Sequence, residues 1–249
     1  MVVLRVSIVL PAYNEARALP GLLESLAKLR VYFPGARLLV VDDGSGDGTA
    51  AVAAVHGAQV VRHSSNLGLG QALLTGLRAC SDADVILTMD ADGTAGLDVA
   101  LALAVAVAGG ADLAVASRYV PGARVAGIPA GRRLLSRAGS VLARLVLGLP
   151  VRDSTSGFRA YSGTVLREAL RLWDGRLVTA RGPACQLELL WKCLPFAHRV
   201  VEVPLVLDYG KRGKSRLRIW RGAAEALACL LRLRTGRRPA PVLQVRQAG

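Results

Sequence analysis

Aromatic residues, methionine and cysteine are scarce in this chain of 249 residues, and basic residues outnumber acidic ones. With aromatics at 4%, the basic groups lack the interleaved rings on which nucleic-acid bases stack, which argues against a nucleic-acid-binding protein. The four cysteines form no CxxC pair and the three histidines are scattered, so we expect no zinc site. We expect the cysteines to be small buried hydrophobes of a reducing compartment.

Long apolar runs are also missing. No stretch of about 18 uninterrupted apolar residues occurs, so no transmembrane helix is predicted. The nearest approach, residues 99–108, is bracketed by Asp98 and Asp112. Residues 1–5 lead directly into a strand pattern and lack the ordered charged, apolar and cleavage regions of a signal peptide, so we expect none.

Positive charge is present in excess. The formal net charge is +14, which favours anionic partners such as nucleic acid, anionic lipid or phosphorylated substrates. Arginine and lysine dominate from Arg118 onward, so we expect the anionic partner to face the second half of the chain. A hydrophobic content of 52% is enough for one large α/β domain with a full core.

Hydrophobic periodicity predicts alternating strands and helices. Strands are predicted at residues 6–10, 38–41, 59–62, 85–89, 113–117 and 200–206. Helices are predicted at residues 16–30, 49–56, 71–79, 97–107, 132–147, 163–172, 185–194 and 221–233. Repeated βαβ units predict a mostly parallel sheet with helices on both faces. Residues 121–131, rich in Gly, Pro and Ala, are predicted to be a mobile loop.

Two carboxylates, Asp90 and Asp92, follow the predicted strand 85–89. In extended chain, side chains two residues apart point to the same side, so these carboxylates repel each other unless a cation lies between them. Hard oxygen ligands suit Mg²⁺ or Mn²⁺, usually shared with substrate phosphates. The carboxyl edge of a parallel sheet is also where open α/β folds bind ligands. The alternative for this pair is a solvated turn.

Acids and glycines also follow two earlier strands. In residues 10–15 the polar pair Asn14 and Glu15 can cap the next helix, or face a ligand. In residues 40–49 one of two adjacent aspartates can accept a nucleobase N–H while the glycines allow close approach. Residues 66–70 are only weakly like a phosphate loop, and a tight turn is the alternative. Together, these strand ends predict a site for a nucleoside diphosphate and its metal.

Eight segments make the pattern specific: 11–15 (Pro-Ala-Tyr-Asn-Glu), 41–49 (Val-Asp-Asp-Gly-Ser-Gly-Asp-Gly-Thr), 90–92 (Asp-Ala-Asp), 117–119 (Ser-Arg-Tyr), 132–136 (Arg-Arg-Leu-Leu-Ser), 153–159 (Asp-Ser-Thr-Ser-Gly-Phe-Arg), 186–188 (Gln-Leu-Glu) and 213–216 (Gly-Lys-Ser-Arg). With these segments the chain resembles the family 2 glycosyltransferases of the GT-A fold. Within that family it is most similar to the polyprenol-phosphate (dolichol-phosphate) mannose synthases. The resemblance runs from about residue 6 to residue 217.

The resemblance implies a role for each matching residue. The residues that would hold the nucleoside are Pro11, Tyr13, Glu15, Val41 and Asp43. Those at the metal and diphosphate would be Asp90, Ala91 and Asp92, with Arg118, Arg212 and Arg216 facing the phosphates. Asp90, Asp92 and Arg118 would be the catalytic residues. Arg132 and Ser136, one helical turn apart, would receive the acceptor phosphate.

Three departures from the family pattern affect these roles. Thr94 stands where a further metal ligand is expected, in a segment without the usual proline turn. Arg212 lies closer to the Gly-x-Ser segment than its family counterpart. Arg216 replaces a lysine, which keeps the charge and changes the geometry of the phosphate contact.

The resemblance implies a GT-A domain at 1–217, followed by a basic amphipathic helix and tail at 218–249. Arginines alternate there with Trp220 and leucines, a pattern that suits an anionic membrane surface. The predicted helix 132–147 carries the same mixture. The alternative is a helix that packs on the domain and leaves its arginines in water. We therefore expect a cytoplasmic protein, peripheral at the inner face of the membrane, with a possible membrane-anchoring subunit.

The expected function is an inverting transfer of sugar, with GDP-mannose as donor and a polyprenyl monophosphate as acceptor. Such a phosphate is already ionised at pH 7, so it needs no strong general base. One alternative is a hydroxyl acceptor on a glycan or natural product, for which Glu188 is the candidate base; another is a different donor such as UDP-glucose. The non-enzymatic alternative is a basic lipid- or nucleic-acid-binding protein.

Overall fold

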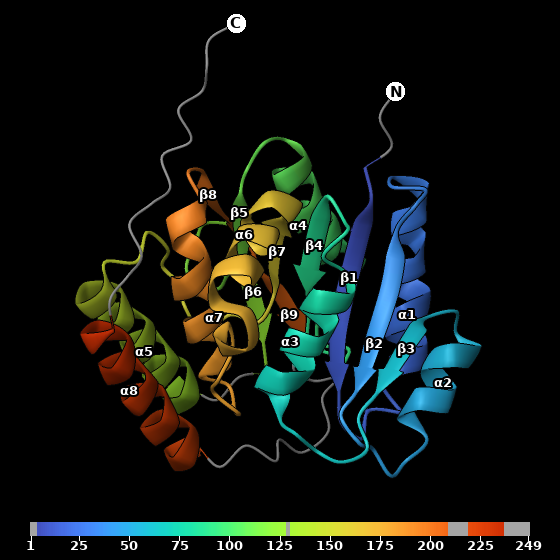
Figure 1. Cartoon of the computed structure of the whole chain (residues 1–249), viewed down its shortest axis with the longest axis horizontal. Helices are drawn as coiled ribbons and strands as arrows, with labels where there is room; N and C mark the ends of the chain where they lie inside the picture. Colours follow the sequence, from blue (N-terminus) through green and yellow to red (C-terminus); the bar gives the residue numbers. More distant parts are fainter. Residues whose placement is uncertain (1–3, 128–129, 209–218, 237–249) are drawn as a thin grey trace, which may run out of the picture.

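The computed structural model describes residues 4–127, 130–208 and 219–236. Its centre is a seven-stranded sheet in the order β3-β2-β1-β4-β7-β5-β8, with helices on both faces (Figure 1). The predicted α/β class, with a mostly parallel sheet flanked by helices, is confirmed. In the part of the chain that is described, no helix combines the length and hydropathy of a membrane span.

Parallel pairing dominates the sheet. β1 (Val6–Ala12) pairs in parallel with β2 (Arg37–Asp42) and β4 (Val85–Thr88), and β2 pairs in parallel with β3 (Gln59–Arg62). At the other edge, β5 (Leu113–Ser117) pairs in parallel with β8 (Val200–Pro204). The carboxyl ends of β1, β2 and β4 therefore meet at one edge of the sheet, as their polar segments predicted.

The helices form two outer layers. One face of the sheet is covered by α1 (Leu19–Ala27, continued by η1, Lys28–Val31), α2 (Thr49–Val55) and α4 (Leu97–Ala108). The other face is covered by α3 (Leu69–Ala79), α6 (Gly163–Trp173, then η2, Asp174–Arg176) and α7 (Cys185–Cys193, then η3, Leu194–Phe196). At the edge of this layer α5 (Ala130–Leu147) and α8 (Ile219–Thr235) lie side by side (Figure 1).

Two strand pairings were not predicted, one within the seven-stranded sheet and one in a separate two-stranded sheet. β7 (Arg159–Ser162) lies antiparallel between β4 and β5, although its four residues show no β-branched run. The segment predicted to be a loop at 121–131 contains β6 (Arg124–Ala126), which pairs in parallel with β9 (Val206–Asp208). That prediction was wrong at β6, because such short strands are determined by a distant partner rather than by their own pattern.

Candidate active site

The segments that follow β1 and β2 hold each other in place. The backbone N–H of Asn14 donates to the Ser45 hydroxyl at 2.9 Å, and the Asn14 side-chain oxygen accepts from the N–H of Gly46 at 3.0 Å. The N–H of Glu15 donates to the Thr49 hydroxyl at 3.0 Å. Asn14 adopts a left-handed conformation with φ of 57°. These bonds turn the chain after β1 so that Glu15 lines a cleft at the sheet edge, next to Pro11 of β1.

Asp43 anchors the segment 66–70. Its carboxylate accepts from the backbone N–H groups of Leu67 at 2.9 Å and Gly68 at 2.8 Å, and lies 2.7 Å from Nδ1 of His63. A Cβ atom at Gly70 would lie 1.9 Å from the carbonyl oxygen of Ala180, so only glycine fits there. Asp43 thus fixes the loop that brings Leu69 to the cleft.

Asp90 and Asp92 line the cleft just beyond the end of β4. Asp92 is buried, and its Oδ1 accepts from both the Thr94 hydroxyl at 2.6 Å and the Thr94 N–H at 3.1 Å. Among the described residues, no group of three or more His, Cys, Asp or Glu side chains could hold a metal ion. A cation bound by these two carboxylates would therefore need further oxygen ligands, such as substrate phosphates.

Arg118 is held rigidly on the opposite side of the cleft. Its guanidinium donates to both carboxylate oxygens of Asp153 at 2.7 Å and to the Thr155 hydroxyl at 2.7 Å. Asp153 is fully buried, and a bidentate pair of this kind fixes the plane of the guanidinium. The Tyr119 ring lies 5.4 Å from the Arg118 guanidinium carbon. Arg118 is thereby fixed at the border of the cleft.

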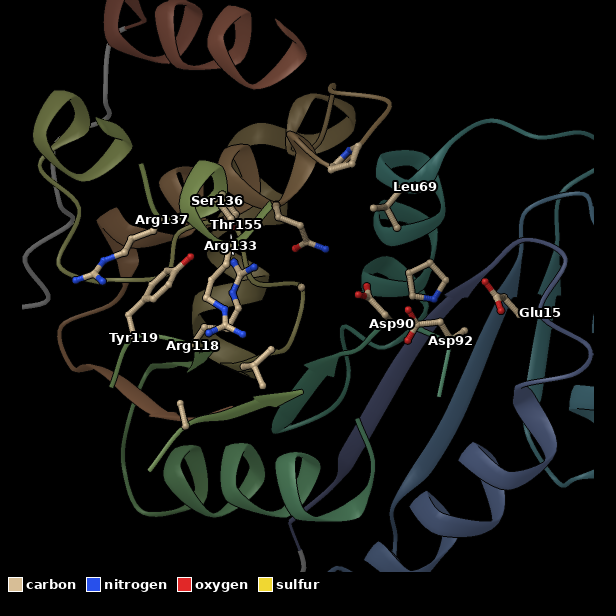
Figure 2. Close-up of a pocket in the computed structure, with 17 residues that line it drawn as sticks. Glu15, Leu69, Asp90, Asp92, Arg118, Tyr119, Arg133, Ser136, Arg137 and Thr155 are labelled. Atoms are coloured by element: carbon tan, nitrogen blue, oxygen red, sulfur yellow. Dashed lines mark hydrogen bonds between the residues drawn. The ribbon is translucent and has the colours of Figure 1, made fainter. Parts of the chain in front are cut away.

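The cleft has a volume of about 550 Å³ and two halves of opposite charge. Figure 2 shows Asp90, Asp92 and Glu15 on one side, and Arg118, Arg133 and Arg137 on the other. The remaining lining residues are Pro11, Leu69, Ala91, Tyr119, Ala123, Val125, Ser136, Thr155, Gly157, Pro183 and Gln186. A volume of this size suits a small-molecule ligand with several polar groups.

The residues with roles implied by the resemblance are distributed unevenly. Those that line the cleft are Pro11, Glu15, Asp90, Ala91, Asp92, Arg118 and Ser136. Tyr13 is 46% exposed and Val41 belongs to the buried core, and neither lines the cleft. Thr94 lines a second hollow between α1 and α4, which Asp92 also borders. Arg212, Arg216 and the side chain of Arg132 lie outside the described residues.

Several lining residues were not predicted. Arg133 and Arg137 come from α5, Gly157 from the segment before β7, and Gln186 from the first turn of α7. Arg133 and Arg137 are four residues apart, so they share one helix face, and that spacing was visible in the sequence. Gly157 and Gln186 lie in the matching segments 153–159 and 186–188, but no role was predicted for them, because their approach to Asp90 depends on the packing of β7 and α7.

Glu188, the candidate base, does not line the cleft. It is buried and accepts from the Thr179 hydroxyl at 2.7 Å, the Ala180 N–H at 2.7 Å and the Lys192 ammonium at 2.7 Å. Burial raises the pKa of Glu188, but the Lys192 ammonium and the Ala180 and Thr179 donors outweigh burial and leave that pKa below its ordinary value. This geometry favours a structural anchor over a base.

Comparison with known proteins gives consistent matches. Residues 7–170 match the family model described as Glycosyl transferase family 2. The polyprenol monophosphomannose synthase of Mycolicibacterium smegmatis is 36% identical, over 86% of this chain and 81% of that protein. The undecaprenyl-phosphate mannosyltransferase of Micrococcus luteus is 34% identical, over 86% of this chain and 88% of that protein.

A solved structure with a similar fold is glucosyl-3-phosphoglycerate synthase from Mycobacterium tuberculosis, crystallised with Mn²⁺, uridine diphosphate and glucosyl-3-phosphoglycerate. It superposes with a TM-score of 0.66 and 25% identity, covering 92% of this chain and 80% of that chain. That protein is thus similar in fold over nearly the whole of the present chain.

Proposed function

The chain belongs to glycosyl transferase family 2, and on this premise we propose that it transfers a mannosyl group from a nucleotide sugar to a polyprenyl monophosphate. The observation that carries the proposal is the division of the cleft into an acidic and a basic half. The acidic half suits a cation and the diphosphate of the donor, and the basic half suits a second, separate phosphate. GDP-mannose is the donor we expect.

The acidic half fits a divalent cation because Asp90 and Asp92 offer hard carboxylate oxygens at a strand end. Asp90 and Asp92 would hold Mg²⁺ or Mn²⁺, which when bound neutralises charge on the leaving nucleoside diphosphate. Thr94 orients the carboxylate of Asp92 through its two hydrogen bonds. Pro11 and Glu15 border the same half, where the nucleoside would lie.

The basic half orients the acceptor. Arg118 is fixed by Asp153, and Arg133, Arg137 and Ser136 project from α5 into the same half of the cleft (Figure 2). An ionised phosphate oxygen attacks the anomeric carbon as the bond to the nucleoside diphosphate breaks, which inverts the configuration. The nucleophile carries its own charge, so arginines that position it contribute through proximity rather than proton transfer. Arg132 is assigned to this half by the family resemblance.

Neutralising the α5 arginines should weaken acceptor binding selectively. For Arg133→Gln and for Arg137→Gln we expect the KM for a short-chain polyprenyl phosphate to rise roughly tenfold, because a charge-assisted contact contributes about 1.5 kcal/mol or more. The KM for the nucleotide sugar should stay within about twofold. Steady-state kinetics in detergent measures both constants.

Arg144→Gln is the matched control, since Arg144 lies on the same helix and does not line this cleft. Equal increases of both KM values in the Arg133 or Arg137 variants would contradict the assignment of this half to the acceptor.

We also place the protein at the cytoplasmic surface of an anionic membrane. On α5, Leu134 is 70% exposed and Leu145 72% exposed, and on the neighbouring α8 Leu231 is 55% exposed. Arg234, which is exposed on α8 one helical turn from Leu231, adds positive charge to this surface. Exposed leucines beside arginines are the pattern of a helix face that lies on anionic lipid. The other side of α8 packs into the core through Leu230 and Leu233.

Charged substitutions on this leucine surface should detach the protein from vesicles. For the double variant Leu145→Glu and Leu231→Glu we expect the partition coefficient onto anionic vesicles to fall at least about tenfold, because each buried leucine contributes about 1.5–3 kcal/mol. Flotation with phosphatidylglycerol vesicles measures the bound fraction. Val55→Glu, at a position 82% exposed on α2, is the control. Equal vesicle binding by the double variant and by Val55→Glu would contradict the proposal that the exposed leucines of α5 and α8 bind the membrane.

The proposed reaction is tested by a two-dimensional screen. Radiolabelled GDP-mannose, GDP-glucose, UDP-glucose and UDP-galactose are each incubated with the enzyme, Mg²⁺ or Mn²⁺, and a polyprenyl phosphate or the corresponding polyprenol. Solvent extraction then separates lipid-linked product. We expect product only with the phosphate acceptor and mainly with GDP-mannose. Product with the polyprenol, or with hydroxyl acceptors alone, would promote the hydroxyl alternative.

A further inference from the structure

Gln186 is a buried polar side chain on the floor of the cleft. It lies in the first turn of α7, is 4% exposed and lines the cleft. Its side-chain oxygen accepts no hydrogen bond from any described residue. Buried amide groups are nearly always hydrogen-bonded, so an amide without such a bond at the wall of a cleft suggests that a ligand completes it.

The surroundings of Gln186 hold its backbone firmly. Arg159 is fully buried in β7 and donates to the carbonyl oxygens of Gln186 and Ser154. These bonds connect α7 to the segment that carries Thr155 and Gly157 into the cleft. The start of α7 is therefore fixed, while the side-chain oxygen of Gln186 accepts no hydrogen bond from any described residue.

The amide of Gln186 lies beside the carboxylate of Asp90. A Cβ atom at Gly157 would be 3.0 Å from Oδ1 of Asp90 and 3.1 Å from Nε2 of Gln186, so both groups approach the same point. The carbonyl oxygen of Gly157 accepts from the Thr88 hydroxyl at 3.0 Å, which holds this point against β4. Glycine at 157 therefore leaves room for the ends of both side chains to come together.

We propose that the amide of Gln186 hydrogen-bonds a hydroxyl group of the hexose that is transferred. This inference rests on the proposed function. The hexose must lie between the diphosphate, on the Asp90 side, and the attacking phosphate, on the side of Arg118 and Ser136. Gln186 borders the cleft next to Asp90, within reach of that position. A hydroxyl both donates and accepts, so it satisfies either end of the amide.

A site that hydrogen-bonds a substrate hydroxyl discriminates strongly against analogues that lack it. Gln186 is therefore a specificity-determining residue for the donor sugar. The competing role is indirect: the amide could merely orient Asp90. In that case a substitution would weaken binding of the nucleoside diphosphate itself, with or without a sugar.

The test uses Gln186→Met, which keeps length and removes both polar atoms of the amide. With the donor that the wild-type enzyme uses, we expect kcat/KM to fall roughly 10- to 100-fold. Calorimetry should give a nucleoside diphosphate affinity within about twofold of wild type. Monodeoxy donors, each lacking one hexose hydroxyl, are then compared in both proteins. We expect one of them to lower kcat/KM in the wild-type enzyme and to cause no further loss in the Gln186→Met variant. Gln59→Met, at an exposed position of β3, is the control.

Two results would overturn the inference: an equal loss of affinity for the nucleoside diphosphate alone, or deoxy donors that lose the same factor in both proteins at every position. A Gln186→Ala variant repeats the series if the methionine variant melts early. The affinities for the nucleotide sugar and for the nucleoside diphosphate can both be measured by calorimetry without an acceptor, and their ratio reports on Gln186. A wild-type enzyme that binds the donor and glycosylates no polyprenyl phosphate would thus refute the proposed function while this ratio still tests Gln186.

Discussion

Asp92→Asn should reduce sugar transfer by a factor of roughly 10²–10³, and Asp90→Asn should do the same, while both proteins stay folded. Each substitution removes a negative charge from the acidic half of the cleft, and a bound cation stabilises charge on the leaving group by several kcal/mol. An asparagine oxygen at position 92 can still accept both hydrogen bonds from Thr94, so the local structure should survive. Turnover and melting temperature of the purified variants measure the two effects.

Chelation should mimic these substitutions. EDTA should remove activity from the wild-type enzyme, and added Mg²⁺ or Mn²⁺ should restore it. Asp98→Asn is the matched control, because Asp98 is an exposed aspartate in the first turn of α4, just past the same segment. Full activity in EDTA, or an equal loss in the Asp98 variant, would remove the metal from the mechanism.

Glu188→Gln should cost stability rather than chemistry. It leaves the ammonium of Lys192, only 7% exposed, without its carboxylate partner, and breaking a buried pair in this way costs about 3 kcal/mol or more. For a domain of this size that corresponds to a fall of about 6–12 °C in melting temperature. Turnover below that temperature should remain within a few-fold of wild type, since an ionised phosphate acceptor needs no base.

A thousandfold loss of turnover in a Glu188→Gln protein that melts normally would contradict the anchor and promote the hydroxyl acceptor. Glu168→Gln is the control, because Glu168 forms an exposed ion pair with Arg171 on α6. This substitution should shift the melting temperature very little.

The stability cost of Glu188→Gln should also depend on pH in a defined direction. The pKa of Glu188 in the folded protein lies below its ordinary value of 4.5, so folding favours the ionised form. The stabilisation is therefore fully present above pH 4.5 and is lost as the pH falls through the lower, folded-state pKa. Melting curves of the variant and the wild type should differ by a constant amount between pH 7 and 5 and converge in more acidic buffer.

Local patterns predicted much of the fold and the acidic half of the site. The alternation of apolar strands and amphipathic helices was readable because each element shows its own period along the chain. Asp90 and Asp92 stand at the end of such a strand, and parallel strands bring their carboxyl ends to one edge. The motif resemblance to family 2 glycosyltransferases is confirmed by the family match over residues 7–170.

Polar residues within the motifs could not be assigned from their type alone. Asp43 and Glu188 are carboxylates in matching segments, yet the structure surrounds each with backbone donors and a basic side chain. Whether a carboxylate faces ligand or protein depends on which donors come within about 3 Å. The donors to Asp43 lie 24 and 25 residues further along the chain, and those to Glu188 come from the loop before α7 and from the next turn of the helix.

The sequence by itself determined the class of fold, the family and the position of the acidic strand end, because these depend on local periodicity and contiguous motifs. Only the tertiary structure decided the floor of the cleft and which arginines of α5 complete its basic half. β7 is inserted antiparallel, and its buried Arg159 binds the backbone of Gln186. That insertion sets Gly157 and Gln186 beside Asp90. Pairing between strands more than forty residues apart produces this arrangement, and no periodicity within the short strand encodes it.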